Sequence, residues 1–145
     1  MDITIRAGTA ADFPALLELI HEFATFQKTP EKVLIDLEQM HRDEGLFQCF
    51  VAEAGDKIVG FASYCLVYFS WSGRALYLDD LYVQPAFRGQ KLGIRLMDAV
   101  IAFAWDMHCR KVRWQVSRWN ENAIAFYKSR GAQIDDVEIN CDLWL

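Results

Sequence analysis

Two neighbouring carboxylates stand in a stretch that is otherwise apolar. Asp79 and Asp80 lie within "ALYLDDLYV", residues 75–83. Successive residues of a strand face opposite sides of its sheet, so the two cannot share one solvent surface, and at least one should face a helix-covered side or a cleft. Burying an unpaired carboxylate is costly. We therefore expect capture by Arg74, by Arg113 or by an N–H group, or a use in binding or proton transfer.

A second candidate site is the loop "RGQKLG", residues 88–93, which precedes an expected helix over residues 92–107. The first N–H groups of a helix have no partner within it, and the helix dipole adds about half a positive charge there. Cations from Arg88, Lys91 and Arg95 should surround the same point. Together they predict a phosphate site, although the loop is neither a P-loop nor a G-x-G-x-x-G motif. The alternative is a surface turn with solvated charges.

The elements that would position these groups follow from periodicity, capping and turn signals. A capping box at residues 9–12 should open a helix that ends near Phe26, Pro30 should start a second helix that stops before Gly45, and Gly131 should end the last one. We predict strands at residues 3–6, 47–54, 57–69, 75–83, 111–116 and 137–145, and helices at residues 9–26, 30–44, 92–107 and 122–130. The order is β-α-α-β-β-β-α-β-α-β, an α/β fold.

Composition limits the classes of function. A chain of 145 residues with 53% apolar and 24% charged residues suits one globular domain, residues 1–145. A net charge of −5 and no basic run argue against nucleic acid and suit a cationic small molecule. Charged residues near the start and short apolar runs predict neither a signal peptide nor a membrane span, so we expect a cytoplasmic protein.

The four cysteines show no metal-site spacing. Cys49, Cys65, Cys109 and Cys141 are scattered without a C-x-x-C pair. We expect them to be reduced and mostly buried, with no bound metal.

Several segments together resemble one family. "LYLDDLYVQPAFRGQKLGIRLMDAVIAFA" and the later "WNENAIAFYKSRGAQ" resemble the acetyl-coenzyme A core of the GNAT N-acetyltransferases, and in particular the spermidine/spermine (diamine) acetyltransferases; "IRAGTAADF" and "IVGFASY" extend the likeness. The resemblance implies a mixed, mostly antiparallel, twisted sheet flanked by helices. It also implies acetyl-CoA as co-substrate, no metal, and a homodimer.

Lys91 departs from the family pattern of Gln or Arg, two residues, Gly, one residue, then Gly or Ala. Arg88 and Gly93 fill the first and last places, but Lys91 stands where the middle glycine usually is. A positive φ there would cost lysine about 1–2 kcal/mol. We predict that the position does not need a positive φ and that Lys91 adds a cation beside the pyrophosphate.

The resemblance also assigns roles along the chain. Asp79 takes the place of the catalytic glutamate that accepts the amine's proton through water, and Tyr127 that of the acid that protonates the leaving thiolate. Asp80 becomes a structural or substrate-binding neighbour. The strand that holds Asp79 should splay from the next one and leave a backbone N–H for the thioester oxygen. The implied cofactor contacts are Leu81, Tyr82, Val83, Arg88, Gly89, Gln90, Lys91, Leu92, Gly93, Asn120, Ala123 and Tyr127.

The amine that would accept the acetyl group is the feature that the sequence defines least. Polyamine-acetylating relatives have acids after the first helix, where this chain has Phe26 and Gln27. Glu18, Glu22, Asp79 and Asp80, with Gln27, could hold one ammonium group, so a diamine or polyamine competes with a lysine-like amino acid or thialysine. A protein N-terminus or lysine, or a sensor that binds acetyl-CoA without turnover, are the alternatives. Trp71 and Trp119 could lie in a dimer interface or in the core.

Overall fold

A computed structural model describes residues 2–145. The chain divides into two compact units, residues 1–114 and residues 115–145. No helix among the described residues is long and apolar enough to span a bilayer.

The first unit contains a mixed sheet with the strand order β1-β2-β3-β4-β5. The first four strands pair antiparallel, and β5 pairs parallel to β4. The β2–β3 hairpin forms as predicted, with Gly55 at φ 64° in its turn. The strands are β1 Ile3–Ala7, β2 Gln48–Ala54, β3 Lys57–Phe69, β4 Gly73–Val83 and β5 Val112–Arg113. This sheet confirms the predicted fold class.

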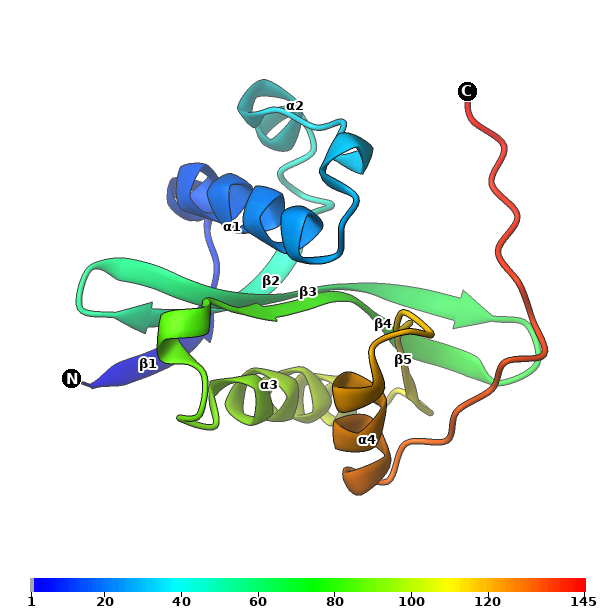
Figure 1. Ribbon diagram of the computed structural model, residues 1–145. Helices are drawn as coiled ribbons and strands as arrows, with labels where there is room; N and C mark the ends of the chain where they lie inside the picture. Colours follow the sequence, from blue (N-terminus) through cyan, green and yellow to red (C-terminus); the bar gives the residue numbers. More distant parts are fainter. Residues whose placement is uncertain (1) are drawn as a thin grey trace. The chain divides into compact units, whose positions relative to one another are not determined.

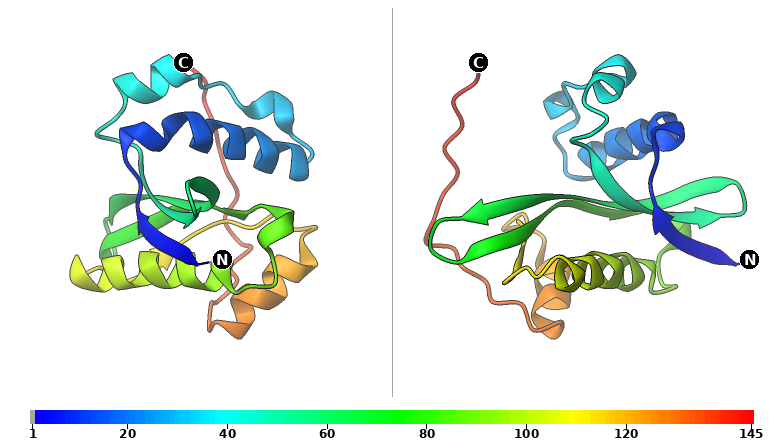
Figure 2. Two further views of the ribbon diagram at one scale, coloured as in Figure 1. Left: turned by 90° about the vertical axis from the view of Figure 1, so that its left-hand side faces the viewer. Right: turned by 180° about the vertical axis from the view of Figure 1, so that it is seen from behind.

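Helices cover both faces of this sheet. The helices α1 (Phe13–Phe26) and α2 (Leu37–Arg42) lie over one face, and α3 (Leu92–Asp106) lies over the other (Figure 1). The same layering is visible from the side and from behind (Figure 2).

The prediction of one long second helix from Pro30 is wrong. Only a 3-10 turn forms at Pro30–Lys32, and Val33 is extended. The helix α2 begins instead after Asp36, whose side chain accepts a 2.8 Å hydrogen bond from the Gln39 N–H. Asp36 is an effective N-cap, and no side-chain cap forms at Thr29, so the chain starts its helix at the better cap.

Alternation along the strands divides the core between the two faces. The α1 face buries a cluster that joins α1 and α2 to the sheet: Phe13, Leu16, Leu19, Met40, Cys49, Val51, Ile58, Phe61 and Tyr82. On the other face, the Phe103 ring of α3 packs against Phe50 and Tyr64, with ring centroids 6.3 and 5.2 Å apart. Tyr82 therefore marks the α1 side of β4.

The second unit contains α4, Glu121–Ser129, and no strand in its described residues. Gly131, at φ 90°, ends this helix as predicted. The predicted strand at residues 137–145 does not form, and the predicted strand at 111–116 shortens to Val112–Arg113. The apolar alternation of Val137, Ile139 and Leu143 is present, but a strand also needs a neighbour that supplies its hydrogen bonds.

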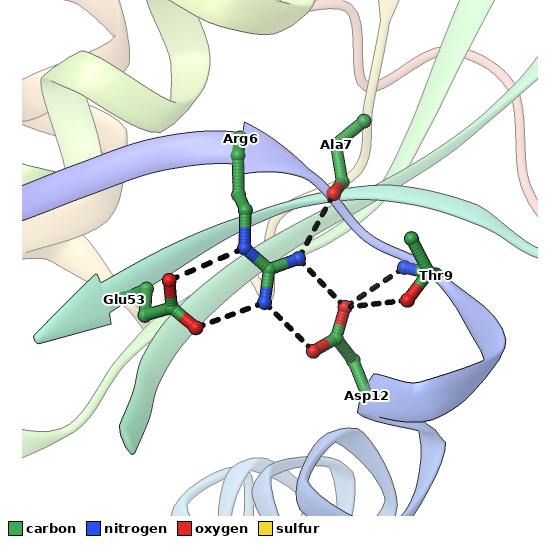
Figure 3. A network of polar contacts seen from close by, with 5 residues as sticks. All are labelled: Arg6, Ala7, Thr9, Asp12 and Glu53. Carbon is green, nitrogen blue, oxygen red and sulfur yellow. Dashed lines mark hydrogen bonds and ion pairs between the residues drawn. The ribbon is translucent and has the colours of Figure 1, made fainter. Parts of the chain in front are cut away.

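An ion-pair network fixes the start of α1 to the sheet (Figure 3). Arg6 of β1 donates two 2.8 Å hydrogen bonds to the Asp12 carboxylate and, from Nη2, a 3.0 Å bond to Glu53 of β2. The Thr9 N–H also donates to Asp12, at 2.8 Å, which confirms the predicted capping interaction. Because Arg6 binds its ionised form, the pKa of the buried Asp12 lies below its usual value.

We predict that Asp12→Asn lowers the free energy of unfolding by about 2 kcal/mol at pH 7, because Arg6 loses an ionised partner at a buried site. The stabilisation from a depressed carboxyl pKa is present above the unfolded value, about 3.9, and is lost as pH falls through the folded pKa. The difference between variant and wild type should therefore shrink below about pH 4. Urea unfolding at both pH values measures this.

The exposed Asp56→Asn should change stability by less than about 0.5 kcal/mol and serves as the control. An Asp12→Asn protein as stable as the control at pH 7 would contradict the role of this network.

Candidate active site

The two aspartates lie at a β-bulge. In the ladder between β3 and β4, Ser63 pairs with Asp80 and Tyr64 pairs with Leu78, so Asp79 has no partner. One extra residue in β4 breaks the strict alternation of faces at this point. The expectation that Asp79 and Asp80 must face opposite sides therefore does not hold here.

Asp80 lies on the face covered by α1. Residues two apart in a strand share a face, and Tyr82 belongs to the core cluster under α1. The cross-strand partner Ser63 is only 4% exposed, and its Oγ accepts a 3.2 Å hydrogen bond from the Asp80 N–H. The sequence interpretation missed Ser63; its signal was a lone small polar residue within the apolar strand that faces the aspartates.

Both carboxyl groups resist ionisation. Burial and, to a smaller extent, the charge of Asp79 together raise the pKa of Asp80 to about 7. Asp79 is exposed in part, yet the surrounding protein still raises its pKa. A carboxyl group that titrates near neutral pH suits proton transfer.

No described residue forms an ion pair with either aspartate. Arg74 donates to the Met107 carbonyl at 2.7 Å, and Arg113 lies 4.7 Å from the Phe69 ring centre. The two cations that the sequence offered as structural partners are therefore engaged elsewhere. Among the described residues, the pair remains free to meet a ligand.

The outer edge of β4 is open beyond Tyr77. Pairing with β5 covers only Leu76 and Tyr77. On the β3 side, the Gln84 N–H donates to the Val59 carbonyl at 2.9 Å. Backbone N–H groups alternate between the two edges of a strand, so those of residues an even number away from Gln84 also point toward β3. The N–H groups of Leu81 and Val83 consequently point to the open edge, while that of Tyr82 points to β3. This is the splay that the family resemblance implied, and it exposes backbone donors.

Two residues of the loop before α3 adopt a left-handed backbone conformation. Gly89 has φ 84°, and Lys91, the N-cap of α3, has φ 63° and ψ 22°. The prediction that position 91 needs no positive φ is therefore wrong. Lysine tolerates this conformation at a cost of about 1–2 kcal/mol, which glycine would avoid.

The start of α3 is shaped for an anion. A Cβ added at Gly89 or Gly93 would meet no atom within 4 Å, so both glycines leave their backbone open to an approaching group. The N–H of Arg95 closes the first helical bond, to the Lys91 carbonyl at 3.0 Å, which leaves the preceding N–H groups without helical partners. Gln90, Leu92 and Gly93 thus provide or flank backbone donors that fit a phosphate.

The side-chain cations are less free than predicted. Arg88 donates from Nε to the Val83 carbonyl at 3.0 Å and lies over the rings of Phe26 and Tyr82, 5.1 and 5.7 Å from their centres. Arg95 donates to the Ile3 carbonyl at 2.8 Å. Of the three cations, Lys91 alone shows no such carbonyl contact within the described residues, so the backbone offers more free donors here than the side chains do.

Acidic residues of α1 lie along the same face as Asp80. Glu22 accepts hydrogen bonds from the Tyr82 hydroxyl at 3.2 Å and from Gln84 Nε2 at 3.1 Å. Glu18, one turn earlier, borders a cavity of about 320 Å³ that Gln84 also lines. Gln27 caps the end of α1 and donates its backbone N–H to Phe23. Glu22 and Asp80 thus lie on the same side of the sheet, Glu22 through its bond to the Tyr82 hydroxyl, whereas Glu18 lies a turn earlier in α1 and Gln27 at its end.

The second unit holds the other predicted site residues. Asn120 is the N-cap of α4, and its side chain accepts a 3.2 Å hydrogen bond from the Ala123 N–H. The Tyr127 ring packs against Phe126 with centroids 5.4 Å apart. Burial raises the pKa of Tyr127, which keeps the phenol protonated at neutral pH.

Three of the four cysteines are at least partly exposed. All four cysteines are free, but only Cys49 is buried, so the expectation that most are buried is wrong. Within residues 2–145, no group of three or more His, Cys, Asp or Glu side chains could hold a metal ion.

Comparison with known proteins identifies the family. The family model described as "Acetyltransferase (GNAT) family" matches residues 13–132. The chain belongs to this family. A thialysine N-epsilon-acetyltransferase of Sus scrofa is 34% identical over 143 residues, which cover 90% of this chain and 84% of that protein. A spermidine/spermine N(1)-acetyltransferase-like protein 1 of Homo sapiens is 34% identical over 139 residues, which cover 88% of this chain but 20% of that protein.

Solved structures agree on the GNAT fold. An aminoglycoside acetyltransferase from an uncultured soil metagenomic sample, in complex with trehalose, superposes with a TM-score of 0.83 at 24% identity, covering 98% of this chain and 97% of that one. An aminoglycoside N-acetyltransferase in complex with CoA has a TM-score of 0.79 at 17% identity, covering 98% and 95%. With its relatives named N-acetyltransferases, this GNAT protein is an enzyme of that class.

We predict that Lys91→Gly raises the free energy of unfolding by about 0.5–1 kcal/mol, because relief of the left-handed strain exceeds the added entropy of the unfolded chain. Lys91→Ala removes the same cation but keeps the strain, so it should leave stability near wild type. Urea denaturation of the three proteins makes the comparison. A glycine variant no more stable than the alanine variant would show that residue 91 is not strained.

Proposed function

We propose that this GNAT enzyme transfers the acetyl group of acetyl-CoA to the primary amine of a small molecule in a ternary complex. The proposal rests on one observation above all: the bulge of β4 sets Asp79 and Asp80 directly before the open strand edge. A proton acceptor for the amine and backbone donors for the acetyl donor thus lie on consecutive residues of one strand.

The cofactor contacts follow from the backbone. The open N–H groups of Leu81 and Val83 would bond the pantetheine arm, and one of them would stabilise the negative charge that grows on the thioester oxygen. The start of α3, from Gly89 to Gly93, would hold the pyrophosphate. Bound acetyl-CoA would supply the activated acetyl group. Asn120 and Ala123 of α4 are proposed as further contacts.

The proposed chemistry moves two protons. An alkylammonium near pKa 10 must lose a proton before its nitrogen can attack. Asp79, coupled to Asp80, accepts that proton through a bridging water. As the new C–N bond forms and the C–S bond breaks, the Tyr127 hydroxyl gives its proton to the sulfur, and the proton that the nitrogen loses on becoming an amide returns to the Tyr127 oxygen through solvent. The phenol is protonated at neutral pH and so has this proton to give, although its burial-raised pKa makes it a weaker acid than a free tyrosine.

The proposed acceptor carries one ammonium near the site, as in a short diamine or a lysine-like amino acid. Glu22 and the aspartate pair would bind it on the α1 face. Glu22 is already hydrogen-bonded to Tyr82 and Gln84. Arg88, a cation, lies over Phe26, at the position where polyamine-acetylating enzymes carry acidic residues. A long polyamine with several charges finds less support, and the thialysine-acetylating relative points the same way.

We further propose that residues 1–145 act as one domain, since the family match crosses from the first unit into the second. A cytoplasmic location and a homodimer complete the proposal. Fully exposed Trp71 is available for such an interface.

The test is the release of coenzyme A thiol from acetyl-CoA with spermidine, spermine, short diamines, lysine, thialysine and an N-terminal peptide as acceptors. We expect release with thialysine, lysine or a short diamine to exceed that with spermine. Release only with the peptide would favour a protein acetyltransferase. Acetyl-CoA binding without release in any arm would favour a sensor.

We predict that Tyr127→Phe lowers kcat by about 10²-fold and leaves the affinity for acetyl-CoA near wild type, because only the proton donated to sulfur is lost. Steady-state kinetics and binding titration measure the two effects. Tyr68→Phe, at an 80% exposed residue of β3, is the matched control and should keep full turnover. Equal kcat for both variants would remove Tyr127 from the acid role.

A further inference from the structure

We infer that Ser63 is a positioning residue of the proposed active site: its buried hydroxyl fixes the β4 bulge and thereby holds Asp79 and Asp80 as one proton-sharing pair. This inference deepens the proposed acetyl transfer and rests on it for its kinetic readout. It concerns a residue of β3 that is not itself expected to touch the substrate.

The geometry of the bulge gives the first support. Ser63 is the last paired residue before the register shifts, and Asp80 is its partner. Its Oγ accepts the Asp80 N–H at 3.2 Å, so the side chain is bonded to the backbone of a member of the pair. At 4% exposure, Ser63 is held by the surrounding core and has little freedom to move away.

The chemical character of position 63 gives the second support. Ser63 and Asp12 are the buried polar residues of the described chain, and the carboxylate of Asp12 is occupied by Arg6. A buried hydroxyl is costly unless it is hydrogen-bonded. Its neighbours on the ladder, Ala62 and Tyr64, offer no comparable acceptor to the bulge. Serine at this position is thus explained by its bond to Asp80.

The third support is the electrostatic interaction between the two carboxyl groups at the bulge. Asp79 and Asp80 are close enough that the charge of one opposes ionisation of the other. Two carboxyl groups that interact in this way titrate in two macroscopic steps that belong to the pair. With the pKa of Asp80 near 7, the pair can take up or release one proton near neutral pH, as exchange with a bound amine requires.

The groups around the pair do not neutralise it. Burial first, and then the charge of Asp79, raises the pKa of Cys65 on β3 and of Tyr77 on β4, while the cation Arg113 of β5 lowers the pKa of Tyr77. From α1, Glu22 reaches the same face at Tyr82 and adds negative charge. After burial, the charge of Asp79 is what raises the pKa of Asp80, so separating the two carboxyl groups should lower that pKa.

The experiment measures the pH dependence of kcat at saturating amine for wild type, Ser63→Ala and Ser63→Thr. In wild type the acidic limb should lie near pH 7. Without the hydroxyl, the bulge relaxes and the carboxyl groups separate, so the limb should move down by roughly one unit. We also expect kcat at pH 7.5 to fall about 10-fold, with KM for acetyl-CoA unchanged. Threonine keeps the hydroxyl and should restore both values.

Ser72→Ala, in the turn between β3 and β4, is the matched serine control and should leave the limb in place. Superimposable limbs for wild type and Ser63→Ala would overturn the inference, even if the variant melts at a lower temperature. A threonine variant that behaves like alanine would overturn the part played by the hydroxyl.

Carboxyl ¹³C NMR of aspartate-labelled protein separates this inference from the proposed function, since it needs no turnover. Two coupled titrations in wild type that move apart in Ser63→Ala would support the inference even if no amine is acetylated. Independent titrations near the ordinary aspartate value in wild type would refute it even if acetylation is found.

Discussion

The pairing of β4 is the constraint on which the rest of the site depends. On one side, β3 pairs with β4 along almost its whole length, apart from the bulge at Asp79. On the other side, β5 leaves β4 after Tyr77. A strand with one satisfied edge and one open edge must find partners for its exposed donors in water or in a ligand. Its long pairing with β3 fixes the position of that open edge.

The surrounding elements place complementary groups around this strand. The α1 face contributes Glu22, which accepts a hydrogen bond from Tyr82, two residues beyond Asp80. At the end of β4, the loop turns through Gly89 and Lys91 into α3, whose first N–H groups have no helical partners. The Arg6 network fixes the start of α1 against β1 and β2, and so limits how α1 can shift over this face.

Much of this arrangement follows from local sequence signals. The hairpin at Gly55, the helix after "RGQKLG" and the cap at Thr9 and Asp12 were predictable because each depends on a few adjacent residues. The bulge was not, because it arises from the register between two strands, and periodicity within β4 contains no information on β3. Lys91 adopts a left-handed conformation that residues other than glycine usually avoid, so its φ was not predictable from residue type. The strand predicted at residues 137–145 needed a neighbouring strand, which no local pattern specifies. Solitary polar Ser63 was the visible but unused signal.

The most direct test of the account is amide hydrogen exchange along β4 with and without acetyl-CoA. The N–H groups of Leu81 and Val83 should exchange quickly in the free protein, because they face the open edge, and at least about ten times more slowly in the complex. The Tyr82 N–H, which faces β3, should be protected in both states. Unchanged exchange at Leu81 and Val83 on saturation with acetyl-CoA would contradict the claim that this edge binds the acetyl donor.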